Sequence, residues 1–375
     1  MDCSIGMRSK RPTSFVACAL LAAAAVTSSP ANAGLVTTAY GAAEGFSLSL
    51  FATEVGPGSG CCGPLGIATN SQGQVVMRQD NVGLNRLFND VDLPQTPSTQ
   101  LSSAPYSSFG FGAAITNSGG TLYATNNDAG QRIAVLNNDG SFNHFLTGNG
   151  IGYGGIATDP STGHLISAGN PGGIFDTDPT TGISKLIVPN VFPDGLSVSP
   201  DGTRIYAALG GVVVGYDKTG TQIYDSGAIG SPDGTGVIGG TSKFAGDIVA
   251  NGNDENFWLL NAFGNNLPDL GISAAIIATG GTRDDYVGLD GTNGSLFVTQ
   301  SSEVFRLTCG ANCFFTPPPP VPEPATLALV GLGLAGVVGA PQASSHLALR
   351  RDFFRRSALN EAAFGGFTFA YHAHL

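Results

Sequence analysis

The sequence predicts an all-β fold: a single β-propeller of six four-stranded blades, flanked by an N-terminal signal helix and a C-terminal transmembrane helix. Short apolar runs alternate with turns rich in Gly, Pro, Asn and Asp, the pattern of strands joined by hairpins. The same unit returns roughly every 40–45 residues, the repeat length of propeller blades. The chain has 55 Gly and 22 Pro among 375 residues without a Gly-X-Y period. This composition suits many tight turns and excludes collagen.

Residues 1–33 have the layout of a secretory signal peptide. A basic segment that ends at Arg11 precedes the apolar stretch 15–26, and Ala31 and Ala33 form a small-residue cleavage site. The apolar stretch is too short to cross a membrane comfortably. We therefore expect signal peptidase to cleave after Ala33 and the rest of the chain to be exported.

The clearest copy of the repeat runs from Gly154 to Val188. Four short apolar runs in it predict strands, because Asp-Pro-Ser-Thr-Gly, a Gly/Pro loop and Asp-Pro-Thr-Thr-Gly separate them. Aligning all copies on the Gly or Ala before each first strand gives intervals of 47, 42, 40, 51 and 42 residues. These alignment positions are Gly66, Ala113, Gly155, Gly195, Gly246 and Gly288.

The two ends of the repeat region predict how the ring closes. Residues 45–52 alternate with period two and are expected to form an opening strand, whereas the last copy, 287–307, is short. The N-terminal strand is therefore predicted to complete the last blade. The fifth copy, 244–260, is degenerate, so seven blades remain an alternative if one lies hidden between Gly220 and Asn265.

The repeat pattern Gly-Ile-Ala-x-x-(Asp/Ser-Pro)-x-Gly-x-Leu resembles the blades of NHL and gluconolactonase-like propellers over residues 45–308. The resemblance implies architecture more than function, because the matching residues are strand and turn positions. Gluconolactonase-like propellers hold a divalent metal in the central channel with Glu, Asn and Asp. By that resemblance, Asn127, Asp194, Asp247 and Asp290 could face such a channel, but none aligns with a family metal motif, so the metal ligands are unknown.

A second resemblance covers the end of the chain. After the proline run 317–320, the triplet Pro322, Glu323 and Pro324 precedes the apolar stretch 326–340. This combination resembles the PEP-CTERM sorting signal, which exosortases of Gram-negative bacteria read. The resemblance implies a transient transmembrane helix and processing by exosortase.

The last residues depart from that family pattern. Arginine should follow the transmembrane helix directly, but Arg350, Arg351, Arg355 and Arg356 come late and the chain runs on to Leu375. A reading-frame slip near residue 340 and a natural variant both account for this. The predicted divisions are a signal peptide at 1–33, a propeller at 34–313, a Pro-rich linker at 314–321, a sorting signal with its helix at 322–340, and an atypical, disordered basic tail at 341–375.

The cysteines that follow the signal peptide bear on possible disulfides. Cys61, Cys62, Cys309 and Cys313 follow the signal peptide and are disulfide candidates, since exported cysteines are oxidised. A local 309–313 bridge, a vicinal 61–62 bridge and cross-pairing remain open.

The net charge of the predicted propeller is negative. Residues 34–324 contain 9 Lys and Arg against 24 Asp and Glu, a net charge of −15. Such an acidic body would repel phosphate backbones, so no nucleic acid partner is expected.

Motifs for chemistry are sparse. His144 and His164 flank predicted strands, and neither a Gly-x-Ser-x-Gly elbow nor a His-Glu-x-x-His motif occurs. Asp176-Thr-Asp178 and the stretch 251–256 lack the Gly and the distal Glu of a calcium loop. No cofactor is therefore expected, with incidental Ca²⁺ or another divalent ion as the alternative. Binding by loops would need exposed aromatic residues, for which Tyr153, Phe192 and Trp258 are candidates.

The sequence thus predicts a protein that is more a binder than an enzyme. We expect a secreted propeller of the cell envelope, outer surface or exopolysaccharide matrix, anchored transiently in the inner membrane. Its expected partners are signal peptidase and exosortase during export, and then exopolysaccharide or envelope proteins. The alternatives are a metal-dependent hydrolase or lyase of the gluconolactonase-like type, which needs several carboxylates at one mouth of the channel, and a purely structural matrix protein.

Overall fold

The computed structural model describes residues 34–56, 63–106, 114–126, 130–148, 151–169, 172–264, 267, 273–283 and 286–315. All of these belong to one compact unit, Met1–Val321, and a second unit, Pro322–Leu375, lies wholly outside them. The predictions for the signal peptide, Cys61, Cys62, Asn127, the sorting motif, its helix and the basic tail therefore concern residues outside the described part. Among the described residues, no helix has the length and apolar character needed to cross a membrane.

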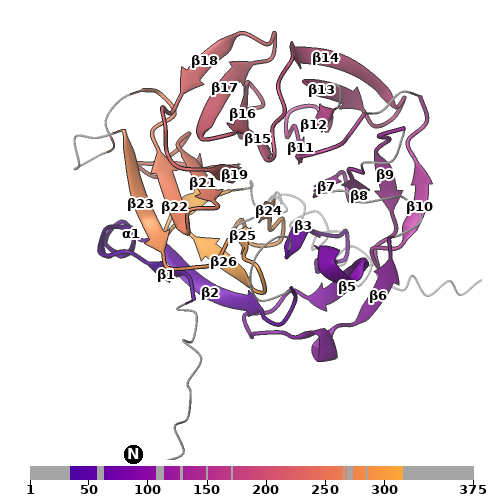
Figure 1. The fold of residues 1–375 in the computed structure, drawn as a ribbon, viewed down its shortest axis with the longest axis horizontal. Helices are drawn as coiled ribbons and strands as arrows, with labels where there is room; N and C mark the ends of the chain where they lie inside the picture. The colour runs from indigo at the N-terminus through magenta and orange to yellow at the C-terminus, as the bar shows by residue number, and fades with distance from the viewer. Residues whose placement is uncertain are drawn as a thin grey trace, which may run out of the picture. The chain divides into compact units, whose positions relative to one another are not determined.

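Six antiparallel sheets stand around a common centre and confirm the predicted six-bladed, all-β propeller (Figure 1). Blades I to IV each take four consecutive strands, from the innermost outward. Blade I consists of β3 (Pro64–Thr69), β4 (Gln74–Gln79), β5 (Leu84–Asn89) and β6 (Ser102–Pro105), and blade II of β7 (Ile115–Ser118), β8 (Thr121–Ala124), β9 (Ala134–Leu136) and β10 (Phe142–Phe145). Blade III consists of β11 (Ile156–Thr158), β12 (Leu165–Gly169), β13 (Gly173–Asp178) and β14 (Ile183–Pro189), and blade IV of β15 (Leu196–Val198), β16 (Arg204–Leu209), β17 (Val212–Asp217) and β18 (Gln222–Asp225).

Blades V and VI include the N-terminal segment. Blade V contains β19 (Pro232–Val237), β21 (Ile248–Gly252), β22 (Asn256–Leu260) and β23 (Ala274–Thr279), with β1 (Val36–Thr37) as a fifth, outermost strand. Blade VI contains β24 (Val287–Leu289), β25 (Leu296–Thr299) and β26 (Val304–Thr308), and β2 (Ser47–Ala52) pairs with β26 from outside. The short helix α1 (Ala39–Ala43) joins β1 to β2.

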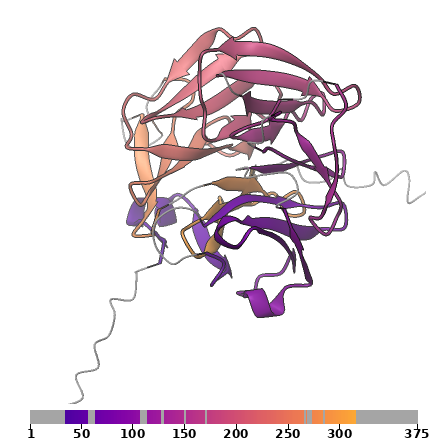
Figure 2. The same cartoon turned by 45° about the vertical axis from the view of Figure 1, so that its right-hand side comes forward.

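The strand β2 closes the ring, as the sequence predicted. Leu48 lies opposite Leu307 and Leu50 opposite Phe305 in the antiparallel ladder. Figure 2 shows the indigo N-terminal strand beside the orange C-terminal strands of the same blade. Because blade VI holds strands from both ends of the propeller, its ladder holds the ring shut.

The fifth copy of the repeat needs a correction. Alignment on Gly246 placed an innermost strand at about 247–250, but in the structure β21 is the second strand and β19 is innermost. The sequence of β19, Pro-Asp-Gly-Thr-Gly-Val, has almost no apolar alternation, although all six of its residues are buried. Its position is fixed by burial at the centre of the ring, and a hidden seventh blade is not present in the described residues.

Asp and Asn side chains cap the turns that follow the innermost strands. The Oδ1 atom of Asn70 accepts the N–H of Gln72 at 2.9 Å, and Oδ1 of Asp159 accepts the N–H of Ser161 at 2.9 Å. Asp290 makes the equivalent bond with the N–H of Thr292 at 3.0 Å. These caps explain why acidic residues recur in the repeat, since a short side-chain acceptor stabilises a tight turn.

Apolar side chains fill the spaces between neighbouring blades, and the innermost strands approach one another too closely for side chains at their first positions. A Cβ atom on Gly195 would lie 2.2 Å from the carbonyl oxygen of Asp233, and one on Gly155 would lie 2.8 Å from that of Asp194. Glycine therefore begins these strands because blades III, IV and V come into backbone contact there. This close packing defines a narrow central channel with two mouths.

Candidate functional site: a pocket at one mouth of the channel

The carboxyl ends of the innermost strands meet around a cavity of about 780 Å³. Thr69, Thr158, Val198 and Leu289 end β3, β11, β15 and β24, Thr116 lies within β7, and all five line the cavity. The volume falls within the range of roughly 300–1,000 Å³ that small-molecule sites occupy. The pocket is a consequence of the repeat, because blades I to IV and blade VI each contribute the residue that precedes the turn after the innermost strand, whereas blade V contributes none of the described lining residues.

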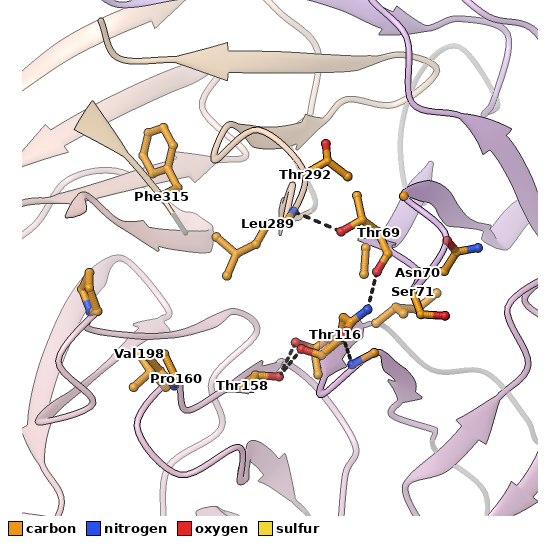
Figure 3. Close-up of a pocket in the computed structure, with 17 residues that line it drawn as sticks. Thr69, Asn70, Ser71, Thr116, Thr158, Pro160, Val198, Leu289, Thr292 and Phe315 are labelled. Carbon is orange, nitrogen blue, oxygen red and sulfur yellow. Dashed lines mark hydrogen bonds between the residues drawn. The ribbon is translucent and has the colours of Figure 1, made fainter. Parts of the chain in front are cut away.

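The first three blades give the pocket a polar wall. Thr69, Thr116 and Thr158 all belong to innermost strands, and Figure 3 shows hydrogen bonds that link this wall. The carbonyl oxygen of Thr69 accepts from Nδ2 of Asn117 at 2.7 Å, and Oγ1 of Thr158 donates to the carbonyl oxygen of Asn117 at 2.8 Å. Oγ1 of Thr69 accepts the N–H of Gly291 at 3.0 Å, which ties blade I to blade VI. The wall is held rigid by bonds between blades.

The facing wall is apolar. Val198 and Leu289 replace threonine at the ends of β15 and β24, and Pro160 and Pro200 follow two of the strands. Figure 3 shows Val198, Pro160 and Phe315 across the cavity from Thr69 and Ser71. None of the described residues that line the pocket is ionisable. The pocket therefore combines a hydroxyl and amide wall with an apolar wall, without a charge on either.

A segment that follows the last blade supplies Phe315. Cys309 and Cys313 form a disulfide with their Cα atoms 5.5 Å apart, and β27 (Cys313–Phe314) pairs with β20 (Gly239–Gly240) beside blade V. The N–H of Phe315 donates to the carbonyl oxygen of Gly294 at 2.7 Å, and the side chain is 4% exposed. Phe315 also borders a small internal space of about 40 Å³ deeper in the channel. We call residues 309–315 the strap; its aromatic ring forms part of the pocket floor.

The opposite mouth carries charge. Asp233 is buried on β19, and Nη2 of Arg283 lies 3.7 Å from its Oδ2. Asp194, exposed at the start of blade IV, has a pKa raised by partial desolvation, and Arg283 acts against that rise. Oη of Tyr286 accepts the N–H of Ile156 at 3.1 Å, and burial raises the pKa of this phenol. Arg283 thus interacts with both carboxylates.

The carboxylates suggested by the resemblance do not converge. Asp194 lies at the charged mouth, whereas Asp247 and Asp290 lie near the ends of β19 and β24. Asp290 is fully buried, and its Oδ2 lies 3.3 Å from Nε of Arg306. Asp247 accepts the N–H of Ala262 at 3.3 Å, and burial raises its pKa to about 7. Within the described part of the chain, no group of three His, Cys, Asp or Glu is placed to hold a metal.

His164 and Asp178 make contacts within blade III, whereas Oδ1 of Asn253 and Oδ1 of Asp254, in the stretch 251–256, are buried without a hydrogen-bond partner. Nδ1 of His164 lies 2.7 Å from Oδ1 of Asp176 within blade III, and His144 is exposed on the outermost strand of blade II. Asp178 caps a turn by accepting the N–H of Thr180 at 2.8 Å. Asp176 and Asp178 thus contact residues of their own blade.

The aromatic candidates fall in two places. Tyr153 and Phe192 are 39% and 56% exposed and precede blades III and IV, and Phe192 is close in sequence to Asp194. Trp258 instead packs partly buried against the core cluster that contains Tyr206 and Val213. The residues of the pocket itself were not singled out from the sequence. The available signal was the Thr that ends Gly-Ile-Ala-Thr at residues 69 and 158.

Comparisons with known proteins agree with the fold and with the C-terminal motif. Residues 320–340 match the PEP-CTERM protein-sorting motif. No curated protein matches the sequence. A gluconolactonase from Xanthomonas campestris superposes with a TM-score of 0.52 at 14% identity, over 73% of this chain and 94% of that one. A second putative gluconolactonase gives a TM-score of 0.52 at 15% identity, over 75% and 99%.

A protein of unknown function from Bacteroides thetaiotaomicron superposes with a TM-score of 0.51 at 12% identity, over 70% of this chain and 76% of that one. At these identities the likeness shows the fold alone. The chain is a six-bladed propeller whose structural neighbours include gluconolactonases, joined to a PEP-CTERM sorting motif. The motif implies export, processing by exosortase and sorting to the cell envelope or surface.

Proposed function

We propose that this protein is a non-enzymatic binding component of the cell envelope or exopolysaccharide matrix. The observation that carries the proposal is the 780 Å³ pocket, whose described lining residues have no ionisable side chain. General acid–base catalysis needs a titratable group within hydrogen-bond reach of the substrate, and a hydroxyl without a base is a weak nucleophile. The pocket has the size of a ligand site, and its described lining residues offer no acid–base group for a reaction.

The route to the surface follows from the two ends of the chain. Cleavage after Ala33 would leave Gly34 as the first residue, directly before Leu35, which is 3% exposed in the core that joins blades V and VI. An N-terminus at Gly34 thus fits a folded propeller without a projecting leader. At the other end, exosortase would act at Pro322, Glu323 and Pro324, and the apolar residues 326–340 would serve as the transient membrane helix.

A metal-dependent hydrolase or lyase is the second candidate, and one observation at the charged mouth favours it. Oδ1 of Asn251 is buried without a hydrogen-bond partner, while its Nδ2 donates to the carbonyl oxygen of Tyr286 at 3.0 Å. Asp233 and Asp194 lie at the same mouth. The guanidinium of Arg283, however, already provides positive charge beside both carboxylates, which weakens the attraction for a second cation.

The sorting part is tested by replacing Pro322, Glu323 and Pro324 together with alanine in a host that contains exosortase. The matched control replaces Pro318, Pro319 and Pro320 with alanine. We expect the first variant to stay in the membrane fraction and the control to be released like the wild type. Release of both variants to the same extent would refute exosortase sorting through this motif.

A further inference from the structure

We propose that the pocket whose floor includes Phe315 of the strap binds a neutral saccharide. This inference rests on the proposed binding function and names the chemical class of its ligand. It is carried by three properties of the pocket: the hydrogen-bonding groups left over on its polar wall, the absence of a counter-charge in its described lining, and the apolar surface that faces the polar wall.

Counting protons on the polar wall shows which groups remain for a ligand. The single proton of the Thr158 hydroxyl goes to the carbonyl oxygen of Asn117 at 2.8 Å. In the 3.0 Å contact between the hydroxyls of Thr116 and Thr158, Thr116 is therefore the donor. Its Oγ1 keeps lone pairs that can accept a hydrogen bond from the cavity.

The neighbouring groups offer donors. Oγ1 of Thr69 accepts the N–H of Gly291 at 3.0 Å, so its own proton remains available. Asn117 accepts the N–H of Gly120 at 2.9 Å and uses one Nδ2 hydrogen on the carbonyl oxygen of Thr69. Its second Nδ2 hydrogen is left over. Acceptor and donor groups thus lie side by side, which suits a row of ligand hydroxyls because each hydroxyl both donates and accepts.

Charge near the pocket disfavours an anionic ligand. The Thr292 hydroxyl at the rim lies within hydrogen-bond distance of the carboxylates of Asp90 and Asp290 and can donate its one proton to either of them. No Lys, Arg or His is among the described lining residues. A carboxylate or sulfate on the ligand would lose its hydration without gaining an ion pair. The cation nearest these carboxylates, Arg306, already pairs with Asp90 and Asp290. A neutral ligand is therefore favoured.

The apolar wall completes the match. Phe315 and Leu289 lie across the cavity from Thr116 and Thr158, and Val198 lies across from Thr69 (Figure 3). A pyranose ring carries C–H groups on its faces and hydroxyls at its edge, so it can place a face on the apolar wall and its edge on the polar one. Ligand sites typically combine such an apolar surface with a few well-placed polar groups.

The test is calorimetric titration of the exported, processed protein with two sets of trisaccharides. The neutral set contains cellotriose, laminaritriose, maltotriose and mannotriose. The anionic set contains the corresponding uronic acid trimers, in which a carboxylate replaces each 6-hydroxymethyl group. Variants Phe315→Ala and Thr116→Val probe the two walls. Their matched controls are Phe192→Ala in the segment before blade IV and Thr308→Val at the exposed end of β26.

We expect at least one neutral trisaccharide to bind at least tenfold more tightly than its uronic acid counterpart. Phe315→Ala and Thr116→Val should each weaken that binding tenfold or more, and the controls should leave it unchanged. Preferred binding of a uronic acid, sensitive to Phe315→Ala, would overturn the neutral class and leave the binding function intact. If no trisaccharide of either set binds below 10 mM, the saccharide proposal fails. Binding that the controls weaken as much as the pocket variants would place the ligand elsewhere and also overturn it.

Discussion

The backbone N–H of Phe315 donates to the carbonyl oxygen of Gly294, 2.7 Å away, and so fastens the end of the described chain to the first hairpin of blade VI. This bond, the β20–β27 pairing and the Cys309–Cys313 disulfide together hold an aromatic ring in the central channel. The pocket floor is thus built by residues that lie just before the Pro-rich segment leading to the sorting motif.

The strap should depend on its disulfide. Replacing both Cys309 and Cys313 with serine removes the cross-link of a loop with a sequence separation of 4 residues. The chain-entropy relation gives a loss of about 2 kcal/mol in the free energy of unfolding for so short a loop. We also expect saccharide affinity to fall, because Phe315 loses its fixed position, while the far-UV circular dichroism of the blades persists. Unchanged affinity in the double variant would show that the disulfide does not position Phe315.

Arg306 should be important for ring closure. It is 4% exposed in blade VI, pairs with Asp90 and Asp92 from the β5–β6 loop of blade I, and lies 3.3 Å from Asp290. Replacing it with methionine leaves buried carboxylates without their cation, which typically costs about 3–5 kcal/mol. Urea unfolding of Arg306→Met measures this loss. The control, Lys185→Met on exposed β14, should stay within about 0.5 kcal/mol of the wild type; a similar effect in both variants would contradict the role of Arg306.

Stability should fall as the pH rises through the titration of Asp247. Burial raises the pKa of this carboxyl to about 7, whereas an unfolded aspartate has a pKa of about 3.9. The folded state therefore favours the protonated form, whose contribution is full below about pH 4 and is lost as the pH rises through about 7. Asp247→Asn can keep the bond from the Ala262 N–H and should remove this part of the pH dependence.

The measurement for Asp247 is urea unfolding at pH 4.5 and at pH 8. Wild type should lose more stability than Asp247→Asn between the two values. The control Asp225→Asn, on an exposed residue at the end of β18, should behave like the wild type. Parallel pH profiles for wild type and Asp247→Asn would show that this carboxyl does not titrate in that window.

Removal of metal ions should leave the stability of the protein unchanged. The reason is that the guanidinium of Arg283 already supplies the positive charge beside Asp194 and Asp233 that would otherwise attract a metal ion. EDTA should leave the Tm of the wild type unchanged. In Arg283→Gln, the carboxylates of Asp194 and Asp233 lose their neighbouring positive charge, so that together with Oδ1 of Asn251 they should attract Ca²⁺, which prefers oxygen ligands. Calcium at roughly five times its Kd would then stabilise the variant by about 1 kcal/mol. Arg204→Gln, which alters an arginine stacked on Phe263, is the control; calcium stabilisation of the wild type would favour the hydrolase alternative.

The blade count and the ring closure were predictable from the sequence, because tight turns leave a local signature. Asn70, Asp159 and Asp290 cap equivalent turns, and the spacing of such turns gives the period of the repeat. The fifth blade was misaligned for the opposite reason. Residues Pro232–Val237 form a strand that is buried at the centre of the ring. They are mostly Gly, Thr, Asp and Pro, so their sequence shows no alternation of apolar and polar residues.

The pocket could not be predicted in the same way. Thr69, Thr116 and Thr158 are ordinary strand residues in the linear sequence, and only the circular arrangement brings them to one mouth. Phe315 is separated from the proline run only by Thr316, where the composition indicates a linker. Its role depends on a strand pairing with Gly239 and Gly240, more than 70 residues earlier in the chain.

The central claim, a sorted propeller that works without a bound metal, is tested most directly by the intact mass and metal content of the protein recovered from the surface or medium of a host with exosortase. We expect a chain that begins at Gly34 and ends between Pro322 and Thr326, without a stoichiometric divalent ion. A chain that still extends to Leu375 and carries one tightly bound divalent ion would contradict both the sorting and the non-enzymatic function.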